Sequence, residues 1–384
     1  MDLSLYQKSN LLYDQESVLR YRPGGYHPVT LGDVFKNDRY KIYHKLGWGG
    51  YSTVWLAKDR DQDQWVALKI MTADSEASRE LQNMRHLERE CPSNLSSVYI
   101  VQLLDAFTHE GPNGVHQCLV LELLGPSVNH VLRDYSDPCS PNDPLEPEII
   151  LRLSTQVIKA VRFIHSSGMC HGDVSDHNMA FTCTAILDAT PEKLLEIIGS
   201  PEIEELARID GKPLEKGQPT QLVKAAEWVD WIDEDEEEIR LIDFGEAFLQ
   251  GDEPERLHQP GILQVPETIL TDSFDYRLDL WRLGLVIYAF AFMAYPFMYL
   301  GDDEFLGICR LNGRRSGKSC RRNLEFDQEH NRLESRFARR VQDPELQPLM
   351  AVIKGFMRFL PSSRLTTEKA LELLHVSSAE EGKH

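Results

Sequence analysis

Short apolar runs separated by turns follow a polar, irregular start of forty residues. The runs 40–46, 52–57 and 65–71 have the composition of β-strands, and a glycine cluster joins the first two. Two such runs that flank a glycine turn predict a β-hairpin. A helix is predicted around 80–87, where apolar residues fall on one face, and another β run covers 118–123.

The pattern changes after Gly125. Behind Pro147, apolar residues recur at helical spacing, which predicts an amphipathic helix over 147–164. A long middle stretch, 182–238, has scattered glycines and prolines and ends in an acidic run, and the remainder is mostly helical in pattern. This order predicts a small β-rich lobe followed by a larger helical lobe.

The run 283–300 carries no charge and is as long as a marginal membrane span. Because it contains Gly284 and Pro296, we interpret it as a buried core helix and expect no membrane contact. Asp2 stands where a signal peptide would be cationic, and no CxxC pair occurs among the seven cysteines. We therefore expect an intracellular protein, cytoplasmic, nuclear or both, with the basic stretch 314–322 as a surface loop or a nuclear signal.

Composition limits the class of partner. The 384 residues include 41 Lys and Arg against 61 Asp and Glu, a formal net charge of −20. The length suggests two or three domains or one two-lobed unit. Phosphate binding without sequence preference needs a basic face, so we expect no direct nucleic-acid binding. The acidity permits a cationic partner, although it also serves solubility.

A glycine cluster is the first candidate for chemistry. Residues 47–54 fit G-x-G-x-x-G-x-V, except that Ser52 takes the place of the third glycine. Glycines let backbone N–H groups approach phosphate oxygens without side-chain obstruction. The flanking runs are β-like on both sides, whereas a dinucleotide-binding fingerprint opens directly into a helix. The context favours a phosphate-covering hairpin, with a plain hairpin turn as the alternative.

A lysine ends the apolar strand that follows. Val66-Ala67-Leu68-Lys69 places it where it can reach the α- and β-phosphates of a nucleotide if a carboxylate orients it. Glu80, on the predicted helix, is the expected partner, and Glu76 is the fallback. Considered alone, Lys69 is also compatible with an ordinary edge-strand lysine.

Two later motifs complete a set for phosphoryl transfer. Residues 171–178 read HGDVSDHN, and residues 241–245 read LIDFG. The reaction needs Mg²⁺ held against the nucleotide, and a carboxylate that orients the attacking hydroxyl and accepts its proton. Asp173 suits the base, and Asn178 and Asp243 suit the metal. All these elements in this order are improbable by chance.

On these residues the chain resembles the protein kinases, and more narrowly the SR-protein kinases, which phosphorylate serines in arginine/serine-rich segments. The most specific stretch is 21–59, with its elements GGYH, GD-x-F, RY and LGWG-x-x-STVWLA. Val265-Pro266-Glu267 resembles the family's A-P-E, and 279–284 resembles the D-x-W-x-x-G opening of its central helix. Arg364 resembles the late arginine that pairs with the A-P-E glutamate.

The resemblance implies an α+β, two-lobed protein kinase fold with a small antiparallel β-rich N-lobe and a larger helical C-lobe. It divides the chain into an N-terminal extension at 1–39, an N-lobe at 40–124 and a C-lobe at 125–376. The C-lobe carries an insertion at about 182–238, and 377–384 is a tail.

The same resemblance implies ATP as the nucleotide and Mg²⁺ as the metal. Leu121 would lie at the back of the adenine pocket. Glu122, Leu123 and Leu124 would form the hinge, which binds adenine through backbone groups. The nucleotide-contacting residues that it implies are Gly47, Gly49, Gly50, Ser52, Val54, Ala67, Lys69, Leu121, Glu122 and Leu124.

The catalytic loop departs from the family's pattern. Serine/threonine kinases typically have an arginine before the base and a lysine two residues after it, where this chain has Gly172 and Ser175. Without that arginine, and with a short run over 245–265, we expect constitutive activity. His177, four residues after Asp173, stands where tyrosine kinases place a substituting arginine, but neutral histidine is a weaker cation.

The missing lysine predicts a slow enzyme. By analogy with other donors to a transition state, loss of one charge-assisted contact lowers the rate by on the order of 10²–10³. Restoring lysine at Ser175 is expected to raise turnover.

The spacing between the two metal candidates is large. Asn178 and Asp243 are 65 positions apart, whereas a short hairpin needs roughly 15 residues. The surplus looks like the insertion of the SR-protein kinases, and its acidic end, 230–238, is either a solvated loop or a docking surface. Clustered carboxylates pair bidentately with arginine guanidinium groups. By the resemblance, the candidate substrate-docking residues are Asp302, Asp303 and Glu304.

Three functions are compatible with these residues. The first is a monomeric serine/threonine kinase that acts on arginine/serine-rich proteins. The second is a pseudokinase scaffold, favoured by Gly172 and Ser175. The third is a small-molecule phosphotransferase resembling the aminoglycoside and choline kinases, which share H-G-D and I-D-F/W elements. The STVWLA loop, Val265-Pro266-Glu267 and Arg364 disfavour the third function, because that group typically lacks them.

Overall fold

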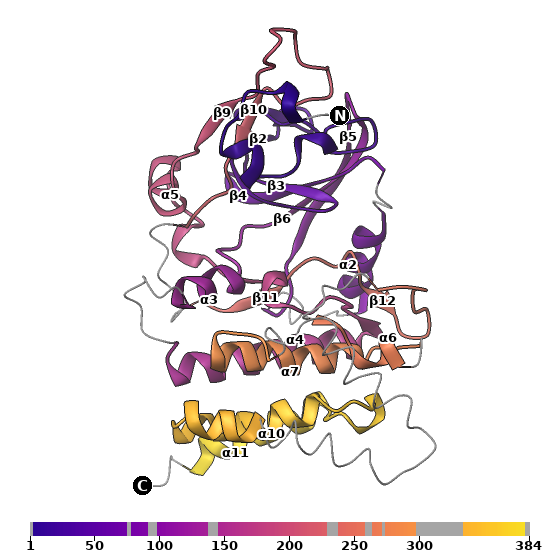
Figure 1. The fold of residues 1–384 in the computed structure, drawn as a ribbon, viewed down its shortest axis with the longest axis vertical. Helices are drawn as coiled ribbons and strands as arrows, with labels where there is room; N and C mark the ends of the chain where they lie inside the picture. The colour runs from indigo at the N-terminus through magenta and orange to yellow at the C-terminus, as the bar shows by residue number, and fades with distance from the viewer. Residues whose placement is uncertain are drawn as a thin grey trace. The chain divides into compact units, whose positions relative to one another are not determined.

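The chain forms two compact units in the computed structural model (Figure 1). The first comprises Met1–Arg85, Val101–Gly125 and Thr182–Glu237, and the second comprises His86–Ile100, Pro126–Phe181 and Glu238–His384. The structure describes residues 3–74, 78–90, 98–136, 145–228, 237–257, 263–270, 273–296 and 333–380.

A six-stranded antiparallel sheet in the order β1-β2-β3-β4-β6-β5 is the centre of the first unit. The predicted hairpin is confirmed, because β2 and β3 pair on either side of the glycine cluster. Helix α2 (Ser78–Glu90) follows β4 and confirms the predicted helix. The strands are β1 (Val34–Phe35), β2 (Tyr40–Gly49), β3 (Ser52–Asp59), β4 (Gln64–Met71), β5 (Leu103–Gly111) and β6 (Gly114–Glu122).

Alternate residues of the central strands enter two different hydrophobic clusters, because successive side chains point to opposite faces of a sheet. Trp55 and Leu68 belong to the cluster on one face. Leu56 and Trp65 belong to the cluster on the other face. Strand β4 is therefore buried at seven of its eight positions and reads as a nearly continuous apolar run.

Residues of the insertion complete the second cluster. Leu194 and Ile198 of α5 (Pro191–Ile198), together with Trp228, pack against Leu56 and Trp65. Hydrogen bonds also attach the segment to the sheet. The Ala226 amide donates to the Lys45 carbonyl at 2.8 Å, and the Trp65 indole donates to the Ala189 carbonyl at 2.8 Å.

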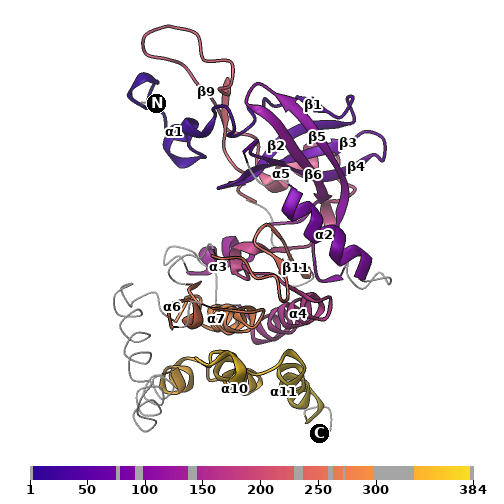
Figure 2. The same cartoon turned by 90° about the vertical axis from the view of Figure 1, so that its right-hand side faces the viewer.

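The segment 182–238 was predicted to belong to the helical lobe. In the structure Thr182–Glu237 groups with the first unit, because its apolar side chains are buried against the sheet. Its strands β9 (Ile203–Glu205) and β10 (Gln221–Val223) form an antiparallel pair. The N-terminal helix α1 (Leu11–Asp14) lies against this pair (Figure 2). Short 3-10 turns at Leu3–Leu5, Val18–Arg20 and Thr184–Ile186 complete the unit.

The second unit is built from helices, and α4, α7, α10 and α11 pack together in it (Figure 2). The predicted helix is confirmed as α4 (Pro147–Ser166), which begins with proline in its first turn. The other helices are α3 (Val128–Ser136), α6 (Pro266–Leu270), α7 (Leu278–Phe292), α10 (Gln347–Phe356) and α11 (Thr367–Glu380). The 3-10 turns are η4 (Asp176–Asn178), η7 (Pro344–Leu346) and η8 (Pro361–Ser363).

Two small antiparallel ladders position the loops of this unit. Strand β7 (Met169–Cys170) pairs with β12 (Phe248–Leu249), and β8 (Met179–Phe181) pairs with β11 (Ile239–Leu241). The loop 171–178 therefore leaves one ladder and enters the other.

Helix α7 is the core of the second unit. It is buried at 14 of its 15 positions. The core helix predicted over 283–300 is confirmed only as far as Phe292, because the helix ends there before Met293, whose φ of 53° is left-handed. Among the described residues, no helix combines the length and the apolarity that a bilayer crossing requires.

Candidate active site

Lys69 lies inside the sheet of the first unit. It pairs with Val54 of β3 and Leu119 of β6, so its strand is not an edge. The residue is 6% exposed, and Nζ donates to Oε1 of Glu80 at 2.8 Å. Glu80, on α2, is 3% exposed. A buried charge is costly unless it is paired, so this ion pair fixes the direction of the lysine. The fallback partner, Glu76, is outside the described residues.

The glycine hairpin connects β2 and β3. Gly49 pairs with Ser52, and Gly47 pairs with Val54. A Cβ atom at Gly47 or Gly49 would meet no described atom within 4 Å, so packing within the chain does not demand glycine there. The space suits a group that approaches the backbone, as a phosphate does. Tyr26 holds the hairpin by donating its hydroxyl to the Gly49 carbonyl at 2.6 Å.

The residues expected around adenine are neighbours in the sheet. Ala67 pairs directly with Leu121, and Val54 is opposite Lys69 two positions along β4. The segment predicted to be the hinge begins where β6 ends at Glu122, whose carboxylate accepts from the backbone amide of Gln102 at 2.8 Å. The next two residues, Leu123 and Leu124, are buried. The first unit therefore brings the predicted nucleotide-contacting residues together.

The predicted base and one predicted metal ligand are bonded to each other in the second unit. The amide nitrogen of Asn178 donates to the Asp173 carbonyl at 2.9 Å and to Asp173 Oδ2 at 2.7 Å. Both hydrogens of the side-chain amide are thereby used, and the amide oxygen remains available to a metal ion. Ser175 is buried, and its hydroxyl accepts from the backbone N–H of Asn178 at 3.3 Å, which caps η4.

Asp279 of α7 holds the start of the catalytic loop. Its carboxylate accepts from the backbone amides of His171 at 2.8 Å and Gly172 at 3.0 Å, and it contacts His165 Nε2 at 3.0 Å. Burial alone would raise the pKa of Asp279, but the hydrogen bond from His165 and the nearby imidazoles lower it below its usual range. A buried carboxylate thus anchors the loop to the central helix.

His171 is fixed by the backbone on both sides of its ring. Nδ1 accepts from the Asp173 amide at 3.2 Å, and Nε2 lies 3.1 Å from the Ile242 carbonyl. Burial lowers its pKa, so the ring is neutral and Nε2 carries the hydrogen. His171 thereby joins the HGDVSDHN loop to the LIDFG segment.

The second predicted metal ligand follows directly. The Ile242 amide donates to the Asn178 carbonyl at 3.0 Å, just beyond the end of the β8–β11 ladder, and Asp243 is the next residue. Asp243 has a left-handed φ of 64° and an exposed side chain. Phe244 is fully buried against His171, with ring centroids 5.0 Å apart. Carboxylate and amide oxygens are the donors that Mg²⁺ prefers, so these two residues fit the metal.

The A-P-E-like segment makes the ion pair that the resemblance implies. Arg364 donates to both oxygens of Glu267, at 2.7 and 2.5 Å, and both side chains are buried. The guanidinium also donates to the carbonyls of Arg358 and Arg277. This arrangement fixes the start of α6 beside α7.

The remaining predicted residues lie at the surface, in the core or outside the described part of the chain. His177 is exposed on η4. The docking residues Asp302, Asp303 and Glu304 are outside the described part of the chain, as are 230–236 of the acidic run. Glu237, which was assigned to a solvated or docking segment, is buried instead: its carboxylate accepts from the amide and hydroxyl of Thr184, both at 2.7 Å.

One charged residue that contacts Asp173 was not predicted from the sequence. Arg282 of α7 is fully buried, and its Nη1 donates to Asp173 Oδ1 at 2.9 Å and to the Gly172 carbonyl at 2.5 Å. The available signal was a lone arginine in the otherwise apolar stretch 280–292.

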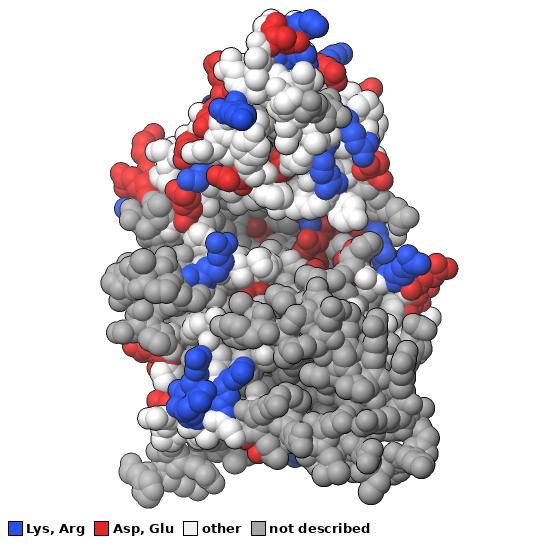
Figure 3. Space-filling view, viewed as in Figure 1, with Lys and Arg blue, Asp and Glu red and all other residues white. Residues whose placement is uncertain are grey.

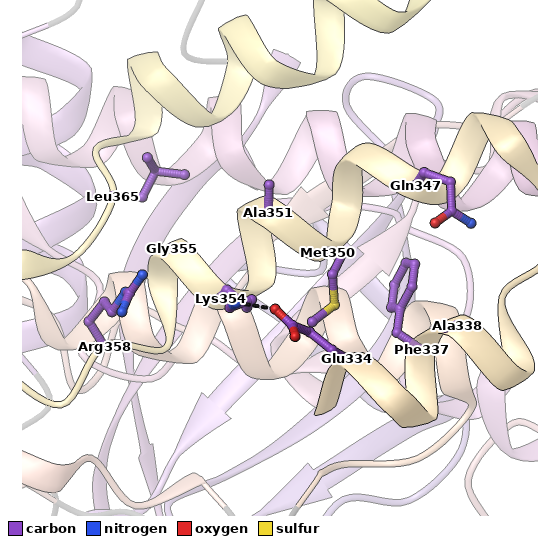
Figure 4. Close-up of a pocket in the computed structure, with 10 residues that line it drawn as sticks. All are labelled: Glu334, Phe337, Ala338, Gln347, Met350, Ala351, Lys354, Gly355, Arg358 and Leu365. Carbon is purple, nitrogen blue, oxygen red and sulfur yellow. Dashed lines mark hydrogen bonds and ion pairs between the residues drawn. The ribbon is translucent and has the colours of Figure 1, made fainter. Parts of the chain in front are cut away.

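An open groove of about 720 Å³ lies elsewhere in the second unit, between the helix at 333–340 and α10 (Figure 4). Phe337 and Met350 line it, and Lys354 forms an ion pair with Glu334 across it. None of its lining residues is a predicted site residue.

Comparison with known proteins identifies the fold. Residues 40–186 match the protein kinase domain family. The chain contains a protein kinase domain. The match includes Lys69, Glu80, Asp173 and Asn178, and it ends within the first residues of the insertion.

The kinase domain has relatives in fungi and animals. The chain is 35% identical over 174 residues to the serine/threonine-protein kinase SKY1 of Saccharomyces cerevisiae. This match covers 43% of this chain and 23% of the relative. It is 30% identical over 276 residues to a serine/threonine protein kinase of Aspergillus fumigatus, 72% of this chain and 63% of the relative. It is 35% identical over 199 residues to SRSF protein kinase 3 of Homo sapiens, 50% of this chain and 31% of the relative.

These matches confirm the resemblance to the SR-protein kinases. The chain spans less than two thirds of the length of each of these relatives. A crystal structure of a kinase domain superposes with a TM-score of 0.60 at 17% identity, covering 91% of this chain and 98% of the other. The predicted protein kinase fold is therefore confirmed.

Proposed function

We propose that this kinase domain transfers the γ-phosphoryl group of ATP to serines of arginine/serine-rich proteins, as a serine/threonine kinase. The observation that carries the proposal is the pair of preformed contacts within the matched region. Lys69 is bonded to Glu80 in one unit, and Asp173 is bonded to Asn178 in the other. The name of SRSF protein kinase 3 supports the substrate class.

Each residue has a role that its surroundings permit. Asp173 orients the serine hydroxyl and accepts its proton, and Lys69 binds the nucleotide phosphates. Asn178 and Asp243 hold Mg²⁺, which neutralises charge on the phosphates. The glycine hairpin, with Tyr26 holding its carbonyl, covers the phosphates through backbone amides.

The geometry at Gly172 supports constitutive activity. Its φ of 77° is left-handed, and a Cβ there would collide with the Glu246 carbonyl oxygen. An arginine at this position is therefore excluded, and with it the usual sensor of activation-loop phosphorylation. Because Ser175 replaces the lysine that contacts the transferring phosphate, we propose a slow enzyme.

The second candidate is a pseudokinase scaffold, which Gly172 and Ser175 favour. It would bind nucleotide and present acidic docking groups without phosphoryl transfer. The insertion does expose acidic side chains around α5 (Figure 3). Its exposed acids are Asp188, Glu192, Glu196, Glu202, Glu205, Asp210, Glu215 and Glu227. For the intact protein we propose a monomer in the cytoplasm, the nucleus or both, without direct nucleic-acid or membrane binding.

Transfer of label from γ-³²P-ATP to an arginine/serine-repeat peptide tests the proposal. We expect phosphoserine with the wild-type chain and none with Asp173→Asn. A thermal shift with ATP and Mg²⁺ but no transfer selects the scaffold. Transfer to a small alcohol or amino sugar alone selects a small-molecule phosphotransferase and contradicts the proposal.

A further inference from the structure

A buried arginine beside the catalytic loop has no role in the proposed reaction so far. Arg282 stands on α7, every residue of which is buried except Ala291. Its side chain has no exposed surface. Burying a guanidinium in an apolar helix is unfavourable unless strong partners compensate. The partners therefore indicate why the charge is there.

Both partners belong to the catalytic loop. Arg282 Nη1 donates to the Gly172 carbonyl at 2.5 Å and to Asp173 Oδ1 at 2.9 Å. Nε and Nη2 have no hydrogen-bond partner among the described residues. The polar interactions of the guanidinium are therefore concentrated on one backbone carbonyl and one carboxylate oxygen. An arginine that served only to fill space would not need either contact.

The contacts define the orientation of the base. Oδ1 of Asp173 is held by Arg282, and Oδ2 is held by Asn178 Nδ2 at 2.7 Å. Two donors, one on each oxygen, fix the rotation of the carboxylate plane. Each carboxylate oxygen has a second lone pair, so the carboxylate still has acceptor sites for a hydroxyl proton. The side chain of Asp173 is 27% exposed, so solvent reaches it from one side.

The carbonyl contact anchors the same arginine to the loop. Gly172 cannot carry a side chain, because its φ is 77° and a Cβ would collide with Glu246. The loop itself therefore supplies no cation at this position. Instead, Arg282 of α7 places a cation against Asp173 from the buried side.

We propose that Arg282 is the positioning residue for Asp173: it is bound to the Gly172 carbonyl and fixes the carboxylate in the orientation that receives the serine proton. This inference rests on the proposed function. Because Arg282 is fully buried, it acts through Asp173 and does not replace the missing lysine at the transferring phosphate.

Kinetics of the full chain with three variants test the assignment. Arg282→Met removes the charge, Arg282→Lys keeps the charge without the planar fork, and Arg336→Met is the control. Arg336 donates to the hydroxyl of Tyr288, which is also on α7, at 2.9 Å, and it forms no hydrogen bond or ion pair with the described residues of the catalytic loop. Melting temperature and near-ultraviolet circular dichroism establish that each variant is folded.

We expect Arg282→Met to lower kcat by about 10²-fold while KM for ATP changes by less than about twofold, since a general base contributes on the order of 10²–10⁴. Arg282→Lys should recover part of the loss and stay about tenfold below wild type, because an ammonium group lacks the fork. Arg336→Met should match wild type. A folded Arg282→Met with wild-type kcat overturns the proposal. If Arg282→Met does not fold, wild-type kcat in Arg282→Lys overturns it.

A second readout does not depend on turnover. The side-chain amide resonances of ¹⁵N-labelled Asn178, assigned with Asn178→Asp, report the position of the Asp173 carboxylate. We expect them to shift in Arg282→Met and to stay unchanged in Arg336→Met. If wild type transfers no phosphate, the proposed function fails and these resonances still decide the positioning role. Unchanged resonances in a folded Arg282→Met contradict it.

Discussion

Two side chains close to Asp173, the proposed catalytic base, differ in what they supply to the loop. Arg282 contacts Asp173 from within the core, and Ser175 occupies the loop position that would carry a phosphate-contacting lysine. Ser175 is 3% exposed, and its hydroxyl caps the turn that carries Asn178. Hydrogen bonds therefore hold the loop around the Asp173 carboxylate, and Ser175 supplies no cation there.

Ser175→Lys should separate activity from stability. We expect kcat to rise by about tenfold or more, because the added ammonium stabilises the transferring phosphoryl group. The variant should also lose at least about 1 kcal/mol of stability, since the capping hydroxyl is removed and a longer, charged side chain enters a buried position. Steady-state kinetics and thermal melts measure the two effects. A folded variant with unchanged or lower kcat would count against the slow-kinase account.

His27 should make the first unit sensitive to acid. Burial, together with repulsion from His109 and His116, lowers the pKa of His27 to about 3. The unfolded chain binds this proton near pH 6.5 and the folded chain does not, so stability falls as the pH drops below that value. Between pH 7 and 5 the free energy of unfolding should fall by about 2 kcal/mol from this residue.

Denaturant unfolding at several pH values measures this effect. His27→Gln should flatten the dependence between pH 7 and 5 relative to wild type. An equal slope in both proteins would show that His27 does not cause the pH dependence of stability.

At the scale of elements, local patterns predicted much of the fold. Helical spacing predicted α4, and the glycine turn between β-like runs predicted the β2–β3 hairpin. Both signals depend on residues close in sequence, where periodicity and turn chemistry act. The contact between Lys69 and Glu80, eleven positions apart, was also predicted from the motif order.

Contacts between distant segments were not predictable in this way. Arg282 contacts Asp173, which is 109 positions away in the sequence, and no local pattern predicts that contact. Glu237 was counted with a solvated acidic run, yet it folds back onto Thr184 and is buried. The insertion was counted with the helical lobe, although its apolar residues find partners on the sheet.

Packing of the insertion predicts a stability difference between two leucines. Leu194 on α5 is 1% exposed in the second hydrophobic cluster, whereas Leu187 is 40% exposed. Leu194→Ala should cost about 2–5 kcal/mol in the first unit, because it leaves a cavity beside the sheet. Leu187→Ala should change stability by less than about 0.5 kcal/mol. Equal effects in denaturant unfolding would contradict the packing.

At the scale of the whole molecule, the net charge of −20 suits a cationic substrate. Asp302 and Asp303 are the proposed docking acids, although they lie outside the described residues. Reversing both to lysine should weaken binding of an arginine/serine-repeat peptide, with a smaller loss at high salt, because screening reduces charge–charge attraction. Fluorescence anisotropy at two salt concentrations measures it. Equal affinity in both proteins would remove this surface from the account.

The central claim is that transfer of the γ-phosphoryl group of ATP requires both Lys69 and Asp173. The most direct measurement is phosphoserine formed on an arginine/serine-repeat peptide by wild type, Lys69→Met and Asp173→Asn, each shown to be folded. We predict Mg²⁺-dependent product with wild type and a loss of at least about 10²-fold in either variant. Product at the wild-type rate in either folded variant would contradict the claim.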